Sequence, residues 1–161
     1  MLDLRGRRYR SSTSASAHQT SQATEILHTL LQRLSDAISS PVAGEYPDAK
    51  QLISQAQHVH QHLAALPPPS PPQDDFRHLR GFHVFLDVLR SFAGFYNPNK
   101  RTESEKKAVF ELLHVVLVTF SAAFRGHPGN RRYFQERVEG GGWEALEQTI
   151  ASIGVCGGDL D

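Results

Sequence analysis

Apolar residues recur at intervals of three and four along most of this chain, which is the period of an α-helix with one buried face. No stretch alternates apolar and polar residues in the way that a β-strand does. The pattern predicts helices over residues 23–38, 47–66, 74–96, 102–125, 128–138 and 143–153. The sequence therefore predicts an all-α protein, an antiparallel array whose successive helices pack on their neighbours. A closed bundle and a solenoid segment both fit this pattern.

Proline, glycine and capping residues set the limits of these helices. Residues 67–72 are nearly all proline, which cannot donate to a helical hydrogen-bond ladder, so they end the second helix. Thr102 and Glu105 form a capping box that opens the fourth helix, and Gly126 is placed to end it in a left-handed conformation. On these signals we divide the chain into a disordered basic and serine-rich tail (1–20), a helical hairpin (21–66), a proline-rich linker (67–73), a second helical segment (74–155) and a flexible tail (156–161).

The second helical segment gives three expectations about packing. Residues 109–124 are almost all apolar, so we expect this helix to have neighbours on all sides. Trp143 follows three glycines at the start of the last helix, and we expect its ring to be a buried anchor there. Arg131 and Arg132 are adjacent and point about 100° apart around a helix axis. We expect one of them to lean inward and donate to carbonyls at the end of the preceding helix, near Phe124.

The composition limits the partners and the cellular compartments that fit the chain. Lys and Arg number 17 and Asp and Glu number 17, so no net charge selects nucleic acid or an acidic membrane as partner. Cys156 is the only cysteine, which excludes an internal disulfide, a zinc ribbon and a redox pair and favours a reducing compartment. Residues 1–10 carry four arginines and are followed by serine and threonine, where a secretory signal would place its apolar core. We therefore expect a cytoplasmic protein.

Three groups of residues resemble reactive sites, and for each a structural interpretation is favoured. His58, His60 and His62 have the spacing of zinc ligands on one helix, but no acidic or cysteine ligand accompanies them, so solvated histidines are favoured. Cys156 lies among glycines, where nothing would hold a catalytic base beside it. Glycines 140–142 follow no strand and precede no lysine, unlike a phosphate-binding loop. We expect no catalytic residue, no metal and no cofactor.

Arginines near the fifth helix suggest a second function. Arg125, Arg131, Arg132 and Arg137 flank two aromatic residues, Tyr133 and Phe134, a mixture that can contact phosphate and stack a base. Residues 139–161 contain five carboxylates and neither Lys nor Arg, so pairing within the molecule is the favoured interpretation. A small nucleic-acid or anionic-lipid binding protein remains the alternative to a protein-interaction scaffold.

Two stretches carry a resemblance to a known family. Residues 123–134 read Ala-Phe-Arg-Gly-His-Pro-Gly-Asn-Arg-Arg-Tyr-Phe, and residues 142–147 read Gly-Trp-Glu-Ala-Leu-Glu. An Asn-Arg-x-x-Phe helix followed by Gly-Trp and a leucine-containing helix resembles the N-terminal helical region of BEACH-domain proteins. This is the family of neurobeachin, the lysosomal trafficking regulator and the WD-repeat and FYVE-domain protein linked to selective autophagy. The triple glycine before Trp143 is similar to the form found in filamentous fungi. The resemblance covers about residues 81–155.

The resemblance implies an armadillo/HEAT-like α-solenoid segment, with residues 74–155 as its armadillo-like part. It implies a non-enzymatic interaction scaffold in vesicle trafficking, lysosome or vacuole biogenesis, or autophagy. Its partners would be other solenoid repeats of the same family architecture or trafficking and autophagy factors. No nucleic acid is expected, and the chain would be cytoplasmic, associated with endomembranes only indirectly. The interaction or structural candidates are Arg125, Asn130, Arg131, Arg132, Phe134 and Trp143.

Overall fold

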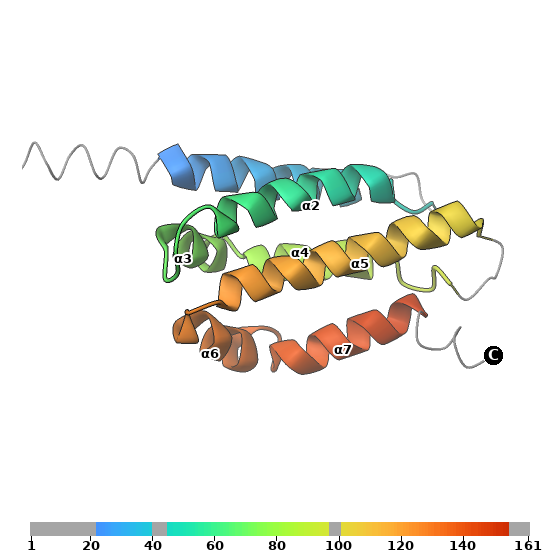
Figure 1. The fold of residues 1–161 in the computed structure, drawn as a ribbon. Helices are drawn as coiled ribbons and strands as arrows, with labels where there is room; N and C mark the ends of the chain where they lie inside the picture. The colour runs from blue at the N-terminus through green and yellow to red at the C-terminus, as the bar shows by residue number, and fades with distance from the viewer. Residues whose placement is uncertain (1–21, 40–44, 97–100, 155–161) are drawn as a thin grey trace, which may run out of the picture.

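A computed structural model describes residues 22–39, 45–96 and 101–154 (Figure 1). The described part of the chain is all-α and contains no strand, which confirms the predicted fold class. A first helix covers residues 22–39, and the others are α2 (Ala49–Ala64), α3 (Pro71–His78), α4 (Gly81–Arg90), α5 (Glu103–Phe124), α6 (Pro128–Arg137) and α7 (Gly142–Ile153). The expected disordered tail (1–20), Cys156 and the flexible tail (156–161) lie outside the described residues.

Five of the helices form two sets, and the helices within each set run in the same direction. The first helix, α4 and α7 begin near the end of the molecule that carries α3 and α6, whereas α2 and α5 begin at the opposite end (Figure 1). α2 packs along α5, and α7 packs along α4. Backbone hydrogen bonds from Gly94 to Ser152 and from Tyr96 to Ile153 join the ends of α4 and α7. Repeated pairs of helices stacked in register are the organisation of a solenoid.

Local signals in the sequence place several helix ends correctly. Thr102 accepts the backbone N–H of Glu105, and the Glu105 carboxylate accepts the N–H of Thr102, which confirms the capping box of α5. Gly126 has the left-handed conformation expected after α5, with φ 60°. In α2 the helix begins at Ala49 because Asp48 caps the N–H of Lys50, so the first helical turn starts after Pro47.

The helix predicted over residues 74–96 is two helices. α3 ends at His78 and α4 begins at Gly81, with Arg80 between them in the left-handed region at φ 63°. The close packing of Gly81 on Phe76 explains the break, because a Cβ at Gly81 would lie 2.5 Å from that ring. α4 then ends at Arg90 instead of continuing to Tyr96.

The proline-rich linker ends earlier in the chain than the sequence predicts. The expected linker, 67–73, gives way to α3 at Pro71, because proline in a first helical turn lacks only an N–H that has no partner in the helix. Pro72 and Gln73 are buried, and the Oε1 of Gln73 accepts the N–H of Ser70 at 2.8 Å. The second half of this segment is therefore part of the packed structure.

α5 is the central helix. It is the one helix among the described residues that is long and apolar enough to cross a membrane, with 22 residues and a mean hydropathy of 1.7 over its most apolar window. In this fold 56% of that window is buried against other helices, as in the core helix of a folded domain. The expectation of neighbours on all sides is wrong for one side, where Phe110 and Leu117 are 60% and 38% exposed.

Aromatic rings fill the core where α3, α4, α5 and α6 meet. Phe82 is fully buried, and its ring centroid lies 4.9 Å from that of Phe76 on α3 and 5.4 Å from that of Phe124 on α5. Phe134 on α6 lies 5.3 Å from Phe82, and Phe120 on α5 lies 5.6 Å away. The Phe76 contact is edge-to-face, a favourable ring geometry. One side chain on α4 thus joins three other helices.

Phe82→Ala is expected to lower the free energy of unfolding by about 3–5 kcal/mol, because it leaves a cavity among rings that cannot all move to fill it. Phe110→Ala is the matched control: the side chain is 60% exposed, so the change should stay within about 0.5 kcal/mol. Chemical denaturation of both variants measures the difference. Equal losses in the two variants would contradict this description of the core.

Two titratable groups, one in α4 and one that contacts it, make the stability of the fold depend on pH. The Arg90 guanidinium donates to the Glu139 carboxylate at 2.7 Å through Nη1, and this hydrogen bond lowers the pKa of Glu139. Burial, followed by the charge of Arg80, lowers the pKa of His83. The Nδ1 atom of His83 is buried and has no hydrogen-bond partner among the described residues. Both groups therefore bind protons less readily in the folded chain than in the unfolded chain.

Stability should fall in two steps on acidification, because a lowered pKa gives stability that is lost as the proton binds. The first step begins as pH falls below about 6.5, the unfolded value of His83, and the second begins below about 4.5, that of Glu139. Thermal unfolding between pH 8 and pH 3 measures both steps. His83→Gln should remove the first step and Glu139→Gln the second, and an unchanged profile in either variant would show that other groups control the acid transition.

Candidate interaction surface

The structure brings three of the six candidate residues together at one corner of the molecule. Arg125 follows α5, Arg131 lies in α6 and Trp143 lies in the first turn of α7. Together with Phe124 they surround a surface hollow of about 500 Å³, and we call the whole lining the Trp143 corner: Ser121, Phe124, Arg125, Arg131, Gln135 and Trp143. Asn130 and Phe134 are fully buried, and Arg132 is exposed but does not line the hollow.

Trp143 is not the buried anchor that the sequence predicted. It is 51% exposed, although one edge of its ring packs on Phe134 at 5.0 Å and on Phe124 at 5.6 Å between ring centroids. The buried residue at this helix start is Gly142, where a Cβ would lie 2.4 Å from the carbonyl oxygen of Phe134. Because the next residue points about 100° further around the helix, Trp143 turns partly toward solvent.

Arg125 and Arg131 bring uncompensated positive charge to the corner. Both residues are exposed, and neither forms an ion pair with a described carboxylate. By contrast, Arg77 and Arg90 each pair with an aspartate one turn away. No described carboxylate therefore competes with a carboxylate or a phosphate from another molecule for these two arginines.

The end of α5 is bound by amide side chains and not by arginine. The Nε2 of Gln73 donates to the carbonyls of Ala122 and Arg125 at 3.0 and 2.7 Å, and the Nδ2 of Asn130 donates to that of Ala123 at 3.0 Å. Arg131 was one of the two residues predicted to reach these carbonyls, and it is exposed. The short amides reach the carbonyls because their own helices pack directly against the end of α5.

Arg132, the other candidate for that role, is also exposed. The network beneath the surface is completed by Asn130, whose Nδ2 donates to the Gln73 carbonyl at 2.9 Å and whose Oδ1 accepts from Arg77 at 3.2 Å. His127 lies beside it and accepts the backbone N–H of Asn130 at its Nδ1. Since Nδ1 accepts in this bond, the neutral ring carries its hydrogen on Nε2, which donates to Asp74 at 2.7 Å. This histidine caps α6 and joins it to α3.

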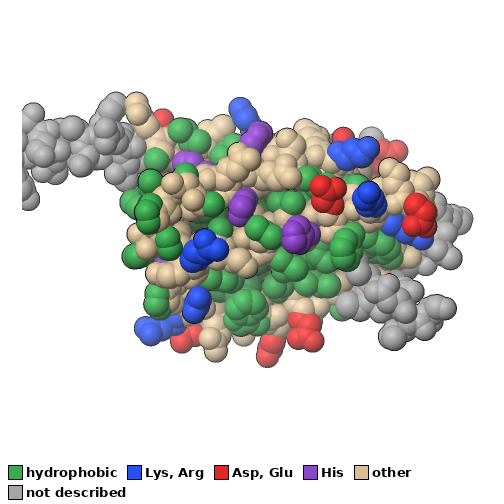
Figure 2. All heavy atoms as spheres, viewed as in Figure 1, with side chains coloured by type: hydrophobic (Ala, Val, Ile, Leu, Met, Phe, Trp, Pro, Cys, Tyr) green, Lys and Arg blue, Asp and Glu red, His purple; other side chains and the backbone are tan. Residues whose placement is uncertain are grey.

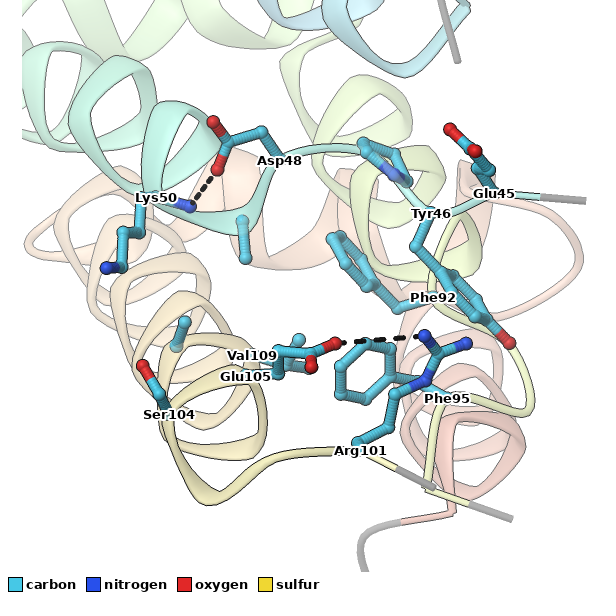
Figure 3. A pocket seen from close by; sticks show the side chains of 13 residues that line it. Glu45, Tyr46, Asp48, Lys50, Phe92, Phe95, Arg101, Ser104, Glu105 and Val109 are labelled. Carbon is cyan, nitrogen blue, oxygen red and sulfur yellow. Dashed lines mark hydrogen bonds and ion pairs between the residues drawn. The ribbon is translucent and has the colours of Figure 1, made fainter. Parts of the chain in front are cut away.

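A second hollow, of about 600 Å³, lies at the opposite end of the molecule, where α2 and α5 begin (Figure 3). The Arg101 guanidinium stacks over Tyr46 at 4.6 Å and over Phe95 at 5.0 Å, and one of its nitrogens lies 3.7 Å from Glu105. The Tyr46 hydroxyl donates to the Ala93 carbonyl. This cluster joins three distant segments, and the helical period gives no signal for it. Arg101 is paired with Glu105, although its Nε is buried without a hydrogen-bond partner among the described residues, and its stacking on two rings helps to hold the helix starts together.

The described residues contain no group of three or more metal-ligating side chains gathered at one point. His58, His60 and His62 lie along α2, and His58 is exposed. The glycines at 140–142 lead into α7, and Gly140 and Gly141 have φ values of 76° and 146° that favour glycine. These glycines shape the turn between α6 and α7.

A family model for armadillo-like repeats matches residues 22–161, a span that includes every described residue. No curated protein and no solved structure matches the chain. Armadillo-like repeats are stacked helical units that bind proteins through their extended surfaces.

Asn130→Asp is expected to lower the free energy of unfolding by roughly 2–4 kcal/mol, because it replaces the donor that serves the Gln73 and Ala123 carbonyls with a carboxylate facing them. The change preserves side-chain volume, so the loss reports on hydrogen bonding and not on a cavity. Arg132→Ala, an exposed change one turn or less away, is the control and should be nearly silent. Equal stability of Asn130→Asp and the wild type would refute the role of the amide network.

Proposed function

The chain belongs to the family of armadillo-like repeats, and from this premise we propose that it is a non-enzymatic scaffold that binds protein partners. One observation carries the proposal: large apolar side chains are exposed along α5 and at the start of α7. Phe110 and Leu117 lie two turns apart on one face of α5, and Trp143 lies at the start of α7. Figure 2 shows hydrophobic side chains gathered in a band between these two helices. Contiguous apolar surface of this kind is typical of a protein interface.

We further propose that the scaffold acts in vesicle trafficking, lysosome or vacuole biogenesis, or autophagy, in the cytoplasm and at endomembranes only through its partners. The resemblance to the N-terminal helical region of BEACH-domain proteins supports this setting, and a fungal origin is part of the same proposal. The residues that carry the resemblance occupy the junction of α5, α6 and α7. Asn130 and Phe134 are buried there, while Trp143 reaches the surface.

Binding of nucleic acid or anionic lipid by Arg125, Arg131 and Arg132 is the alternative. The three residues are exposed, but Arg132 lies outside the hollow that the other two share. Glu144 and Glu147 on α7 are exposed in the same helix as Trp143 and would repel a phosphate backbone that continued along it. The two functions differ in salt dependence, since phosphate binding weakens steeply with salt whereas apolar contacts change little.

We expect the tagged full chain to elute from a gently prepared cell lysate in complexes with trafficking or autophagy proteins, and Phe110→Glu to return it to monomer fractions. A glutamate at this position would place an unpaired charge in the interface. Size-exclusion chromatography with identification of the co-eluting proteins is the measurement. Ile26→Glu is the matched control, because Ile26 is 53% exposed but lies on the first helix, away from α5 and α7.

Three results would contradict the scaffold. The wild type would elute as a monomer, or both variants would lose the complexes equally, or the complexes would dissolve on nuclease treatment or at moderate salt. The last result would favour the alternative function.

A further inference from the structure

One side of α5 has no helix against it. The first helix, α4 and α7 follow one another in one layer, and α2 and α5 follow one another in a second layer (Figure 1). α2 covers one side of α5, and no described helix covers the other side in the same layer. The side chains on that side, Phe110 and Leu117, are exposed for this reason.

The uncovered side has the dimensions of a helix site. Phe110 and Phe124 are separated by about 21 Å along α5 at 1.5 Å per residue, which corresponds to about four helical turns. Leu117 lies between them, and Trp143 and the half-buried Ile150 of α7 form the opposite wall. Apolar residues at one-turn spacing on a facing helix would contact both walls.

The Trp143 corner places positive charge at one end of this site, so the two ends of the site differ. It lies at the C-terminal end of α5 and contains Arg125 and Arg131, which form no ion pair with a described carboxylate. At the other end of α5, Glu103 and Glu105 are exposed but are already paired with Lys106 and Arg101. A helix lying along α5 in the direction of α2 and α5 would place its own C-terminal end at the corner. There its unpaired carbonyls and the negative end of its dipole would face the two arginines.

From this placement we propose that the uncovered side of α5 binds one amphipathic helix of a partner protein, parallel to α5, with acidic residues in its last turn bound by Arg125 and Arg131. The proposal rests on the scaffold function and names the chemistry of the partner. Arginine forks bind carboxylates with two parallel hydrogen bonds, so these contacts fix the direction of the helix. The apolar contacts with Phe110, Leu117 and Trp143 supply the rest of the binding.

A helical peptide fits this surface better than the two other occupants do. Nucleic acid would need a continuous positive track, and Glu111 and Glu147 are exposed on the two helices that form the walls. A second copy of this chain would bring either its own arginine corner or, in an antiparallel contact along α5, Glu103 and Glu105, which are already paired with Lys106 and Arg101. Both occupants are nevertheless distinguished by the experiment.

The experiment selects binders to the full chain from random 16-residue peptides displayed on phage. The selected peptides are expected to carry apolar residues spaced by three, four and seven positions and Asp or Glu in the last turn. Trp143 is the only tryptophan, so its fluorescence reports binding of the best synthetic peptide directly at the site. Its emission should move to shorter wavelength as the ring is covered.

Arg131→Gln is expected to weaken the binding of that peptide about tenfold, since it removes a charge-assisted hydrogen bond. Arg132→Gln is the matched control from the same helix and should leave binding unchanged, because Arg132 lies outside the hollow. Moving the acidic residues from the last turn to the first turn of the peptide, at constant composition, should weaken binding by a similar factor. Circular dichroism of each variant checks that the fold is intact.

Each other outcome overturns the proposal. Absence of selected peptides, selection of peptides without acidic residues, equal loss in Arg131→Gln and Arg132→Gln, or indifference to the position of the acidic residues would each do so. Tighter, salt-sensitive binding of an oligothymidylate would assign the corner to nucleic acid, and a dimer disrupted by Phe110→Glu would assign it to a second copy. If Phe110→Glu still removes the cellular complexes while these peptide tests fail, the scaffold stands and only the helix proposal falls.

Discussion

The positions of α6 and α7 depend on how the C-terminal end of α5 is satisfied. The last carbonyls of a buried helix have no partner within it, and leaving them unbound would cost several kcal/mol. Gln73 of α3 and Asn130 of α6 together bind three of them. Gln73 also accepts the N–H of Ser70, so the same side chain fixes the start of α3. This junction sets the direction in which the chain leaves α5.

The uneven layers of the fold follow from that junction. Because Asn130 holds α6 under the end of α5, the chain turns back and α7 packs along α4, parallel to it. α5 is thereby left with α2 on one side and solvent on the other. The exposed aromatic surface is a consequence of where α7 lies. It is not a local error of packing, because the ring cluster around Phe82 beneath it is closed.

The sequence was informative where the cause of a structure is local. The period of apolar residues and the capping box of Thr102 predict α5 to within a residue, because each depends on neighbours within one or two turns. The break before α4 also had a local signal, since Gly81 interrupts a helical pattern. By contrast, Gln73 and Asn130 act on residues 49 and 57 positions away, and no periodicity marks a polar side chain that will bind a distant carbonyl. The candidate site was predicted only in part for the same reason: three residues of its lining, Arg125, Arg131 and Trp143, were named, whereas Asn130 and Phe134 are buried and the burial predicted for Trp143 is wrong.

Trp143 shows why residue type alone cannot assign a surface. A large aromatic ring beside a glycine break is favoured in a core by its area, and the sequence accordingly predicts burial. Here the start of α7 lies so close to Phe134 that only a residue without a side chain fits at the contact, and that residue is Gly142. The Trp143 ring therefore lies beside this contact, at the edge of the core. One edge of the ring then closes the core while the other remains available beside two unpaired arginines. The same short stretch therefore supplies both the packing of the last helix and the surface that distinguishes this corner, and a substitution at Gly142 would disturb both together.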